Sequence, residues 1–289
     1  MLDTFNIVKS VKHFGKGTGL RRIAVLFLLI SLISGCGVAA KYRIVTRSED
    51  VEIGLPMKEL RVGERFTYKA EWLGLDVGIA TLSVKGITER NGRKVYHIFA
   101  TARSTPIISK IYKVEDEIST YIDVEGLYPV RYEKKQREGG YRSDEYTDFD
   151  HEKGRAFYFS RLNHSKKEYN IPKKVQDTLS CLYYFRLQEA DVGKSIFANV
   201  IADEKNYLLE AKVHKKGVIK IKDVGEWEAF MVEPLPWFQG RIKRKAKATM
   251  WLSADEKRIP LLMVTSGIPF VGTVTITLQK IEDLDTQEQ

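Results

Sequence analysis

The sequence predicts a mainly β fold, an antiparallel β-barrel or a strongly curved sheet with one amphipathic helix. Three observations support this prediction. Apolar and polar residues alternate in several short segments, turn-forming pairs separate these segments, and only one segment repeats its apolar residues at helical spacing. The sequence shows no regular succession of strands and helices of the kind that builds a parallel sheet.

The alternation of apolar and polar residues is clear at positions 65–72, 80–85 and 273–278. A period of two places one set of side chains on the buried face of a sheet and the other set in solvent. Asn91–Gly92 lies between two such segments and predicts a tight hairpin, because this pair tolerates positive φ. A second hairpin is expected around Lys153–Gly154.

The helix is predicted at residues 175–189, VQDTLSCLYYFRLQE. Val175, Leu179 and Leu182 recur at roughly helical spacing, so one side of the helix would lie on the sheet. Asp177 is placed to cap its N-terminus, and Cys181 is expected to be a small core residue.

The N-terminal region has the organisation of an export signal. Basic residues precede an apolar run, Ile23–Ile33, that is shorter than the roughly 20 residues a membrane-spanning helix needs. The run leads into Ile33-Ser34-Gly35-Cys36, which resembles the lipobox of bacterial lipoproteins. We therefore expect residues 1–35 to be a signal peptide and Cys36 to carry acyl groups such as palmitate; a signal anchor or a buried helix with a chance cysteine is the alternative.

Three further segments follow Cys36. Residues 36–60 lack sustained periodicity and are expected to be a tether, residues 61–283 form a single β-rich domain, and residues 284–289 are an acidic tail. The net charge of +9 at pH 7 falls to about +5 once the basic signal peptide is removed.

The predicted lipid anchor indicates a protein of the outer membrane that faces the periplasm of a Gram-negative bacterium. Gly37 follows Cys36, whereas an aspartate there would favour retention at the inner membrane. We expect the membrane to be a partner through the acyl anchor, and we expect no nucleic-acid partner. Cys181 has no second cysteine with which to form an intrachain disulfide.

Several short motifs resemble those of a family of exported bacterial proteins, domain of unknown function 3108. They are Gly63-Glu64, Gln176-Asp177, Leu179-Ser180, Leu182-Tyr183-Tyr184-Phe185-Arg186, Trp251-Leu252-Ser253-Ala254-Asp255 and Arg258-Ile259-Pro260, with Gly74 and Gly78. The likeness covers about residues 60–281, although Thr178 and Cys181 stand where proline and alanine are expected. The resemblance implies a β-rich domain that faces the periplasm, and it supplies no catalytic residue.

The sequence contains none of the short motifs that identify hydrolases, metalloproteases or nucleotide-binding proteins. His97, His151, His164 and His214 are scattered without metal-ligand spacing. We therefore predict no catalytic residue, no metal site and no cofactor. Asp144, Glu145 and Asp148 would have to converge in a cleft for a hydrolase of cell-wall or capsule material, and alternation spreads them along a turn.

Two features suggest a binding site. Apolar, proline-containing connections could gather into a ligand rim at one end of a barrel; the residues concerned are Ile107, Ile108, Trp237, Phe238, Ile268 and Phe270. Lys243, Lys245 and Lys247 would lie on one strand face beside this rim and contact an anionic head group. Loops that plug the barrel and a solvated edge strand are the simpler alternatives.

These features favour a non-enzymatic envelope lipoprotein whose β domain binds a lipid or another apolar envelope component. A scaffold that docks envelope proteins during assembly is the alternative, and it predicts an exposed apolar patch without a cavity.

Overall fold

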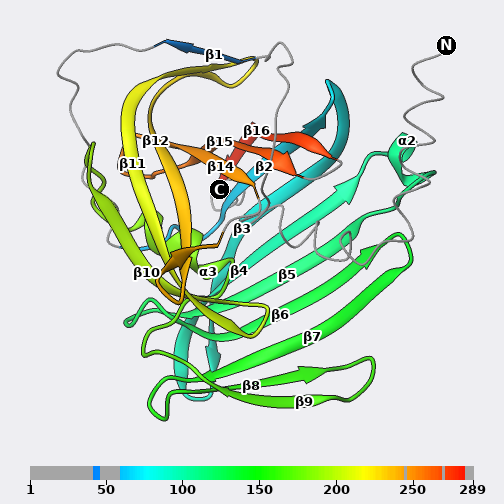
Figure 1. The fold of residues 1–289 in the computed structure, drawn as a ribbon, viewed down its shortest axis with the longest axis vertical. Helices are drawn as coiled ribbons and strands as arrows, with labels where there is room; N and C mark the ends of the chain where they lie inside the picture. Colours follow the sequence, from blue (N-terminus) through cyan, green and yellow to red (C-terminus); the bar gives the residue numbers. More distant parts are fainter. Residues whose placement is uncertain (1–41, 46–58, 244–245, 269–270, 284–289) are drawn as a thin grey trace, which may run out of the picture.

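The computed structural model describes residues 42–45, 59–243, 246–268 and 271–283 (Figure 1). The predicted signal peptide, the lipid-attachment residue Cys36 and the acidic tail 284–289 lie outside these residues. Among the described residues, no helix has both the length and the apolar character needed to cross a bilayer.

The described chain is mainly β, with two short helices. The strands in chain order are β1 (Tyr42–Val45), β2 (Glu64–Trp72), β3 (Leu75–Arg90), β4 (Arg93–Ser104), β5 (Glu115–Asp123), β6 (Pro129–Glu138), β7 (Tyr141–Asp150), β8 (Arg155–Ser160), β9 (Lys166–Asn170), β10 (Ser195–Ala202), β11 (Lys205–Ile221), β12 (Gly225–Phe238), β13 (Arg241–Ile242), β14 (Lys247–Ser253), β15 (Pro260–Ile268) and β16 (Gly272–Asp283). The helices are α2 (Pro106–Ser109) and α3 (Ser180–Arg186).

All the strands belong to one antiparallel sheet, in the order β1-β11-β12-β14-β15-β16-β2-β3-β4-β5-β6-β7-β8-β9. β10 pairs with β11, and β13 pairs with β12. The described strands curve without closing into a barrel, so the curved-sheet form of the fold prediction is confirmed. Figure 1 shows β4 to β9 as a broad curved wall, with β11 and β12 facing it across α3.

The main core lies where the sheet curls around α3. Leu179, Leu182 and Tyr183 pack against apolar residues of β2 to β5 on one side and of β11 to β16 on the other. Six of the seven residues of α3 are buried. The helix is therefore a core element rather than the one-sided amphipathic helix that the sequence predicts. Cys181 is fully buried in this core, as expected.

The helix is also shorter than the predicted residues 175–189. Gln176 forms a parallel bridge with Val200 of β10, which holds the backbone in an extended form ahead of the helix. The carboxylate of Asp177 then accepts hydrogen bonds from the amides of Leu179 and Ser180, at 2.7 and 2.8 Å. Asp177 thus satisfies N–H groups at the helix start, as predicted, but the helix begins three residues after it.

One part of the predicted tether is structured. Residues 42–45 form β1, which pairs with Val218–Ile221 at the end of β11. The two predicted hairpins are confirmed. β3 and β4 meet at Arg90 and Arg93 around Asn91–Gly92, and β7 and β8 meet at Asp150 and Arg155.

Candidate functional site

The inner face of the curved sheet contains an apolar hollow. Its floor consists of Ala80, Ala100 and Ala102 on the neighbouring strands β3 and β4. Ala80 pairs with Ala102, and Ala100 pairs with Leu82, so the three methyl groups form one shallow region. Alanines leave space where larger side chains elsewhere on this face fill the core.

Residues of strands that continue the sheet beyond β2, and of α3, complete the wall of the hollow. Leu262 and Met263 come from β15, Ile276 from β16 and Leu182 from α3. The volume of the hollow is about 60 Å³. A space of this size accommodates only a few water-sized groups. It therefore suits a short apolar segment of a larger ligand rather than a whole phospholipid.

A buried polar cluster borders the hollow on β5 and β6. Asp116 lines the hollow and pairs with Ala102 across the strands. Gln136 donates from Nε2 to Asp116, at 3.3 Å, and to Glu138, at 2.6 Å. The amide of Arg137 donates to the second oxygen of Asp116 at 3.0 Å. All three side chains of this cluster are almost fully buried.

Burial controls the ionisation of this cluster. Removal from water raises the pKa of Asp116, even though hydrogen bonds to its carboxylate act in the opposite direction. Tyr112 lies next to these acids; burial first, and then the charges of Glu138 and Asp116, raise its pKa to about 12.

Tyr68 of β2 adds an unsatisfied polar group to the wall of the hollow. The residue is 7% exposed and lines the hollow, and its hydroxyl has no hydrogen-bond partner among the described residues. Burial raises the pKa of this hydroxyl far above its usual value. A buried hydroxyl without a partner loses free energy, which a polar ligand atom or a water molecule could restore.

The inner face becomes more polar on β6 to β8, beyond the hollow. Lys134 contacts Glu145 at 2.7 Å, and Ser143 and Tyr158 each donate a hydrogen bond to the same carboxylate. Burial acts to raise the pKa of Glu145, but Lys134 and these hydroxyls outweigh it and lower the pKa. Glu145 is therefore held as a paired anion.

The acids considered for a hydrolase do not converge. Glu145 lies on the inner face with Lys134, whereas Asp144 bonds Arg161 and Asp148 bonds Arg131 on the outer face. The histidines are likewise apart: His97 stacks on Tyr121, and His214 contacts Glu233 at 2.7 Å. Within the part of the chain that the structure describes, no group of three or more potential ligands could hold a metal ion.

The predicted ligand rim is not assembled by its described members. Trp237 and Phe238 lie in strand β12 rather than in a loop, because residues 225–237 pair along β11 and Phe238 pairs with Arg241 of β13. The indole of Trp237 donates to Glu210 at 2.9 Å, and Phe238 packs on Tyr207. Ile268 ends β15 and is buried in a small cluster with Ala246 and Val274.

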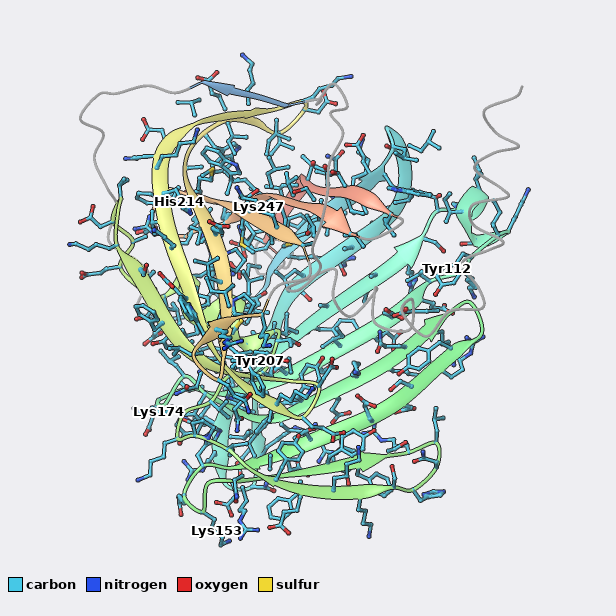
Figure 2. All side chains as sticks on the ribbon, viewed as in Figure 1. Tyr112, Lys153, Lys174, Tyr207, His214 and Lys247 are labelled. Carbon is cyan, nitrogen blue, oxygen red and sulfur yellow. The ribbon has the colours of Figure 1, made fainter. Side chains whose placement is uncertain are left out.

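Ile107 and Ile108 lie in α2, far from the Trp237–Phe238 pair. Ile108 accepts a hydrogen bond from the amide of Tyr112, and Figure 2 shows Tyr112 at the right of the molecule, well apart from Tyr207, which lies left of centre. Phe270 lies outside the described residues. None of the five described rim residues lines the hollow.

The predicted lysine row is also interrupted. Lys243 is exposed just after β13, Lys247 is exposed at the start of β14, and Lys245 lies outside the described residues. β13 ends at Ile242 and β14 begins at Lys247, so the described chain here is not one continuous strand with a lysine face. The head-group role of these lysines stays a prediction.

Comparison with solved structures supports the fold. The crystal structure of a "Beta-barrel-like Protein of Domain of Unknown Function DUF1849" from Brucella abortus is 11% identical in sequence, with a TM-score of 0.53. The match covers 78% of this chain and 100% of that chain. The likeness shows a shared fold and nothing further.

Two more distant structures also match. One is an exported protein, described as "putative", from Bacteroides fragilis with a YmcC-like fold, at 8% identity, TM-score 0.34, and 80% and 99% coverage of the two chains. The other is a "putative lipoprotein" from Parabacteroides distasonis, at 10% identity, TM-score 0.32, and 81% and 100% coverage.

Sequence comparison agrees with the earlier resemblance. No curated protein matches the sequence. The profile of one protein family of unknown function matches residues 67–279, which include most of β2, all of β3 to β15 and most of β16. This chain therefore belongs to the DUF3108 family.

Proposed function

We propose that this protein is a non-enzymatic lipoprotein of the outer membrane, facing the periplasm, whose β domain binds a lipid or another apolar envelope component. The observation that carries the proposal is the hollow lined by Ala80, Ala102, Leu262 and Ile276. Apolar surface released from water there would stabilise a bound apolar group by about 25 cal/mol per Å².

The lining of the hollow suits a hydrocarbon segment. The atoms that face the hollow are almost all apolar, because the hydroxyl of Tyr68 is buried and the carboxylate of Asp116 accepts hydrogen bonds from Gln136 and the amide of Arg137. An acyl chain or another apolar group would match this lining. The acids Asp144, Glu145 and Asp148 are bound to cations on two faces of the sheet, which favours binding over hydrolysis.

The test is native mass spectrometry of the protein extracted under mild conditions. We expect a bound lipid, and we expect Ala80→Phe to abolish it because the added ring fills the hollow. Ile87→Phe is the matched control, since Ile87 lies in the same strand β3, is exposed and does not line the hollow. Both variants should show the thermal unfolding of the parent protein.

Two results would contradict the proposal. One is a protein that carries no lipid yet co-purifies with envelope proteins, which is the result expected of a scaffold. The other is an intact mass that retains the original N-terminus and shows no acyl group on Cys36, which would remove the lipoprotein assignment.

A further inference from the structure

One end of the sheet presents a group of exposed apolar side chains, which we call the apolar tip. Its members come from β3, from the turn before it, and from α2 and the residues after it: Leu73, Leu75, Ile79, Ile107 and Ile111. Ile107 is 75% exposed, more than any other large apolar side chain among the described residues. None of the four residues of α2 is buried, so this helix adds nothing to the core.

Backbone contacts hold the two parts of the tip together. The amide of Thr105, just before α2, donates to the carbonyl of Val77 at 3.0 Å. Its hydroxyl donates to the carbonyl of Asp76 at 3.3 Å. In Figure 1 the β2–β3 turn and α2 lie close together at the upper right, at the same end of the sheet.

The turn that carries Leu73 is unusual for its sequence. Leu73 and Gly74 have φ of 50° and 78° and connect the paired residues Trp72 and Leu75. A turn with two positive φ values favours asparagine or glycine at the first position, and leucine is disfavoured there. The Asn91–Gly92 turn has nearly the same angles, 51° and 73°, and carries the favoured asparagine.

Neither backbone geometry nor core packing explains Leu73, because its side chain is 54% exposed. The same is true of Ile107. Exposed apolar residues clustered at one site mark a surface that contacts another apolar phase.

The charged side chains around the tip indicate the nature of that phase. Lys110 is exposed within the tip, between Ile107 and Ile111. The charges at its margin form ion pairs: Lys113 with Glu115 at 3.0 Å, Arg103 with Glu117 at 4.0 Å, and Lys69 with Asp76 at 3.3 Å. Lys110 therefore gives the tip its excess positive charge, and exposed apolar side chains with a lysine among them favour the surface of a bilayer with anionic lipids.

The position of β1 is consistent with a bilayer as the partner of the tip. β1 crosses the top of Figure 1, on the same side of the molecule as the β2–β3 turn. Cys36 precedes Tyr42 by six residues, which reach at most about 20 Å. An acyl anchor at Cys36 would therefore hold this side of the domain near the membrane.

We propose that the apolar tip inserts into the surface of a bilayer that contains anionic phospholipid. The hollow lies directly behind the tip, because Ala102 and Asp116 are each two residues from the paired Ser104 and Val114 that flank α2 and its following turn. As an extension that rests on the proposed function, the ligand of the hollow would enter from the bilayer at this end.

The test is co-sedimentation with vesicles of phosphatidylcholine and phosphatidylglycerol. It uses residues 36–289 with Cys36→Ser, so that no acyl chain contributes. We expect this protein to bind the vesicles. Ile107→Asp and Leu73→Asp should each weaken binding at least about tenfold, since each removes a large apolar side chain from the contact.

Leu162→Asp is the control, because Leu162 is a comparably exposed apolar residue on the β8–β9 turn, outside the tip. It should bind as the parent does. Equal binding by all variants, or no binding by the parent, would overturn the proposal. Ala80→Phe should still bind vesicles. Vesicle binding therefore tests the tip, and the bound lipid seen by mass spectrometry tests the hollow, so either proposal can be contradicted without the other.

Discussion

The two ends of β2 show opposite uses of side chains. At its first residue, Glu64 is 5% exposed and forms a two-pronged ion pair with Arg186 of α3, at 2.5 and 2.9 Å. At its other end the chain turns through Leu73, an exposed apolar residue in a disfavoured conformation. The first end buries charge where the structure can satisfy it, and the second exposes apolar surface that the fold does not need. Stability and contact with a partner are thus assigned to different ends of one strand.

The buried end should show the largest effect on stability. Arg186 is fully buried, stacks near the rings of Phe66 and Tyr183, and also donates to the carbonyl of Lys257. Glu64→Gln would leave its guanidinium without a counter-charge. We expect a loss of about 3–5 kcal/mol in the free energy of unfolding, measured by chemical denaturation.

Glu282→Gln is the matched control for Glu64→Gln. Glu282 lies on the neighbouring strand β16 and pairs with Arg65 of β2 and with Lys280, and these partners are partly in solvent. Exposed pairs contribute about 0–1 kcal/mol. Similar losses for the two variants would show that burial of the Glu64–Arg186 pair is not what makes it important.

The start of α3 offers a pH-dependent comparison. Burial raises the pKa of Asp177 from 3.8 to about 6, although Thr120 and the amides of Leu179 and Ser180 oppose the shift. The folded state therefore holds the proton more tightly than the unfolded state. This group favours folding below its unfolded pKa, and that contribution is lost as the pH rises through about 6.

Asp177→Asn should remove this dependence. Relative to the parent, the free energy of unfolding of the variant should rise by about 1–3 kcal/mol between pH 4 and pH 7. Asp191→Asn is the control. Its carboxylate is exposed, and Lys194 lowers its pKa, so the relative stability of this variant should not rise over the same range. If the difference in the free energy of unfolding between Asp177→Asn and the parent did not change with pH, the raised pKa of Asp177 would be contradicted.

The difference between local and long-range contacts explains which features the sequence predicts and which it does not. The strands and hairpins are predictable because alternation and Asn91–Gly92 are local signals, read from neighbouring residues. The length of α3 is not, because the parallel bridge between Gln176 and Val200 is a long-range contact that overrides the helical spacing. The prediction that the segment around Trp237 is an apolar loop is wrong, because residues 234–237 pair with residues 208–211 of β11, which are more than 20 positions away in the sequence.

The hollow depends on long-range contacts, whereas the tip has a local sequence signal. Ala80, Ala100 and Ala102 become one floor only through the β3–β4 register, and nothing in their spacing marks them as a site. Asp116 likewise reads as an ordinary charged strand residue until β6 buries it. Leu73–Gly74, in contrast, does carry a local signal, since leucine stands at a turn position where asparagine is the usual residue.

Two turn variants should change stability the least. They also distinguish most directly between the geometry of the β2–β3 turn and its contact with a partner. Leu73→Asn places a residue suited to positive φ in the β2–β3 turn, and the reciprocal Asn91→Leu does the opposite in a turn of nearly the same angles. The left-handed conformation costs most residues about 1–2 kcal/mol and asparagine less. We therefore expect Leu73→Asn to raise the free energy of unfolding by about 1 kcal/mol and Asn91→Leu to lower it by a similar amount.

Vesicle binding should follow the opposite order to stability. Leu73→Asn removes apolar surface from the tip and should bind vesicles less well than the parent despite being more stable. Asn91→Leu leaves the tip intact and should bind as the parent does. A fall in binding caused by unfolding would follow the stability changes in both variants, so a more stable protein that binds less well can only have lost the contact itself.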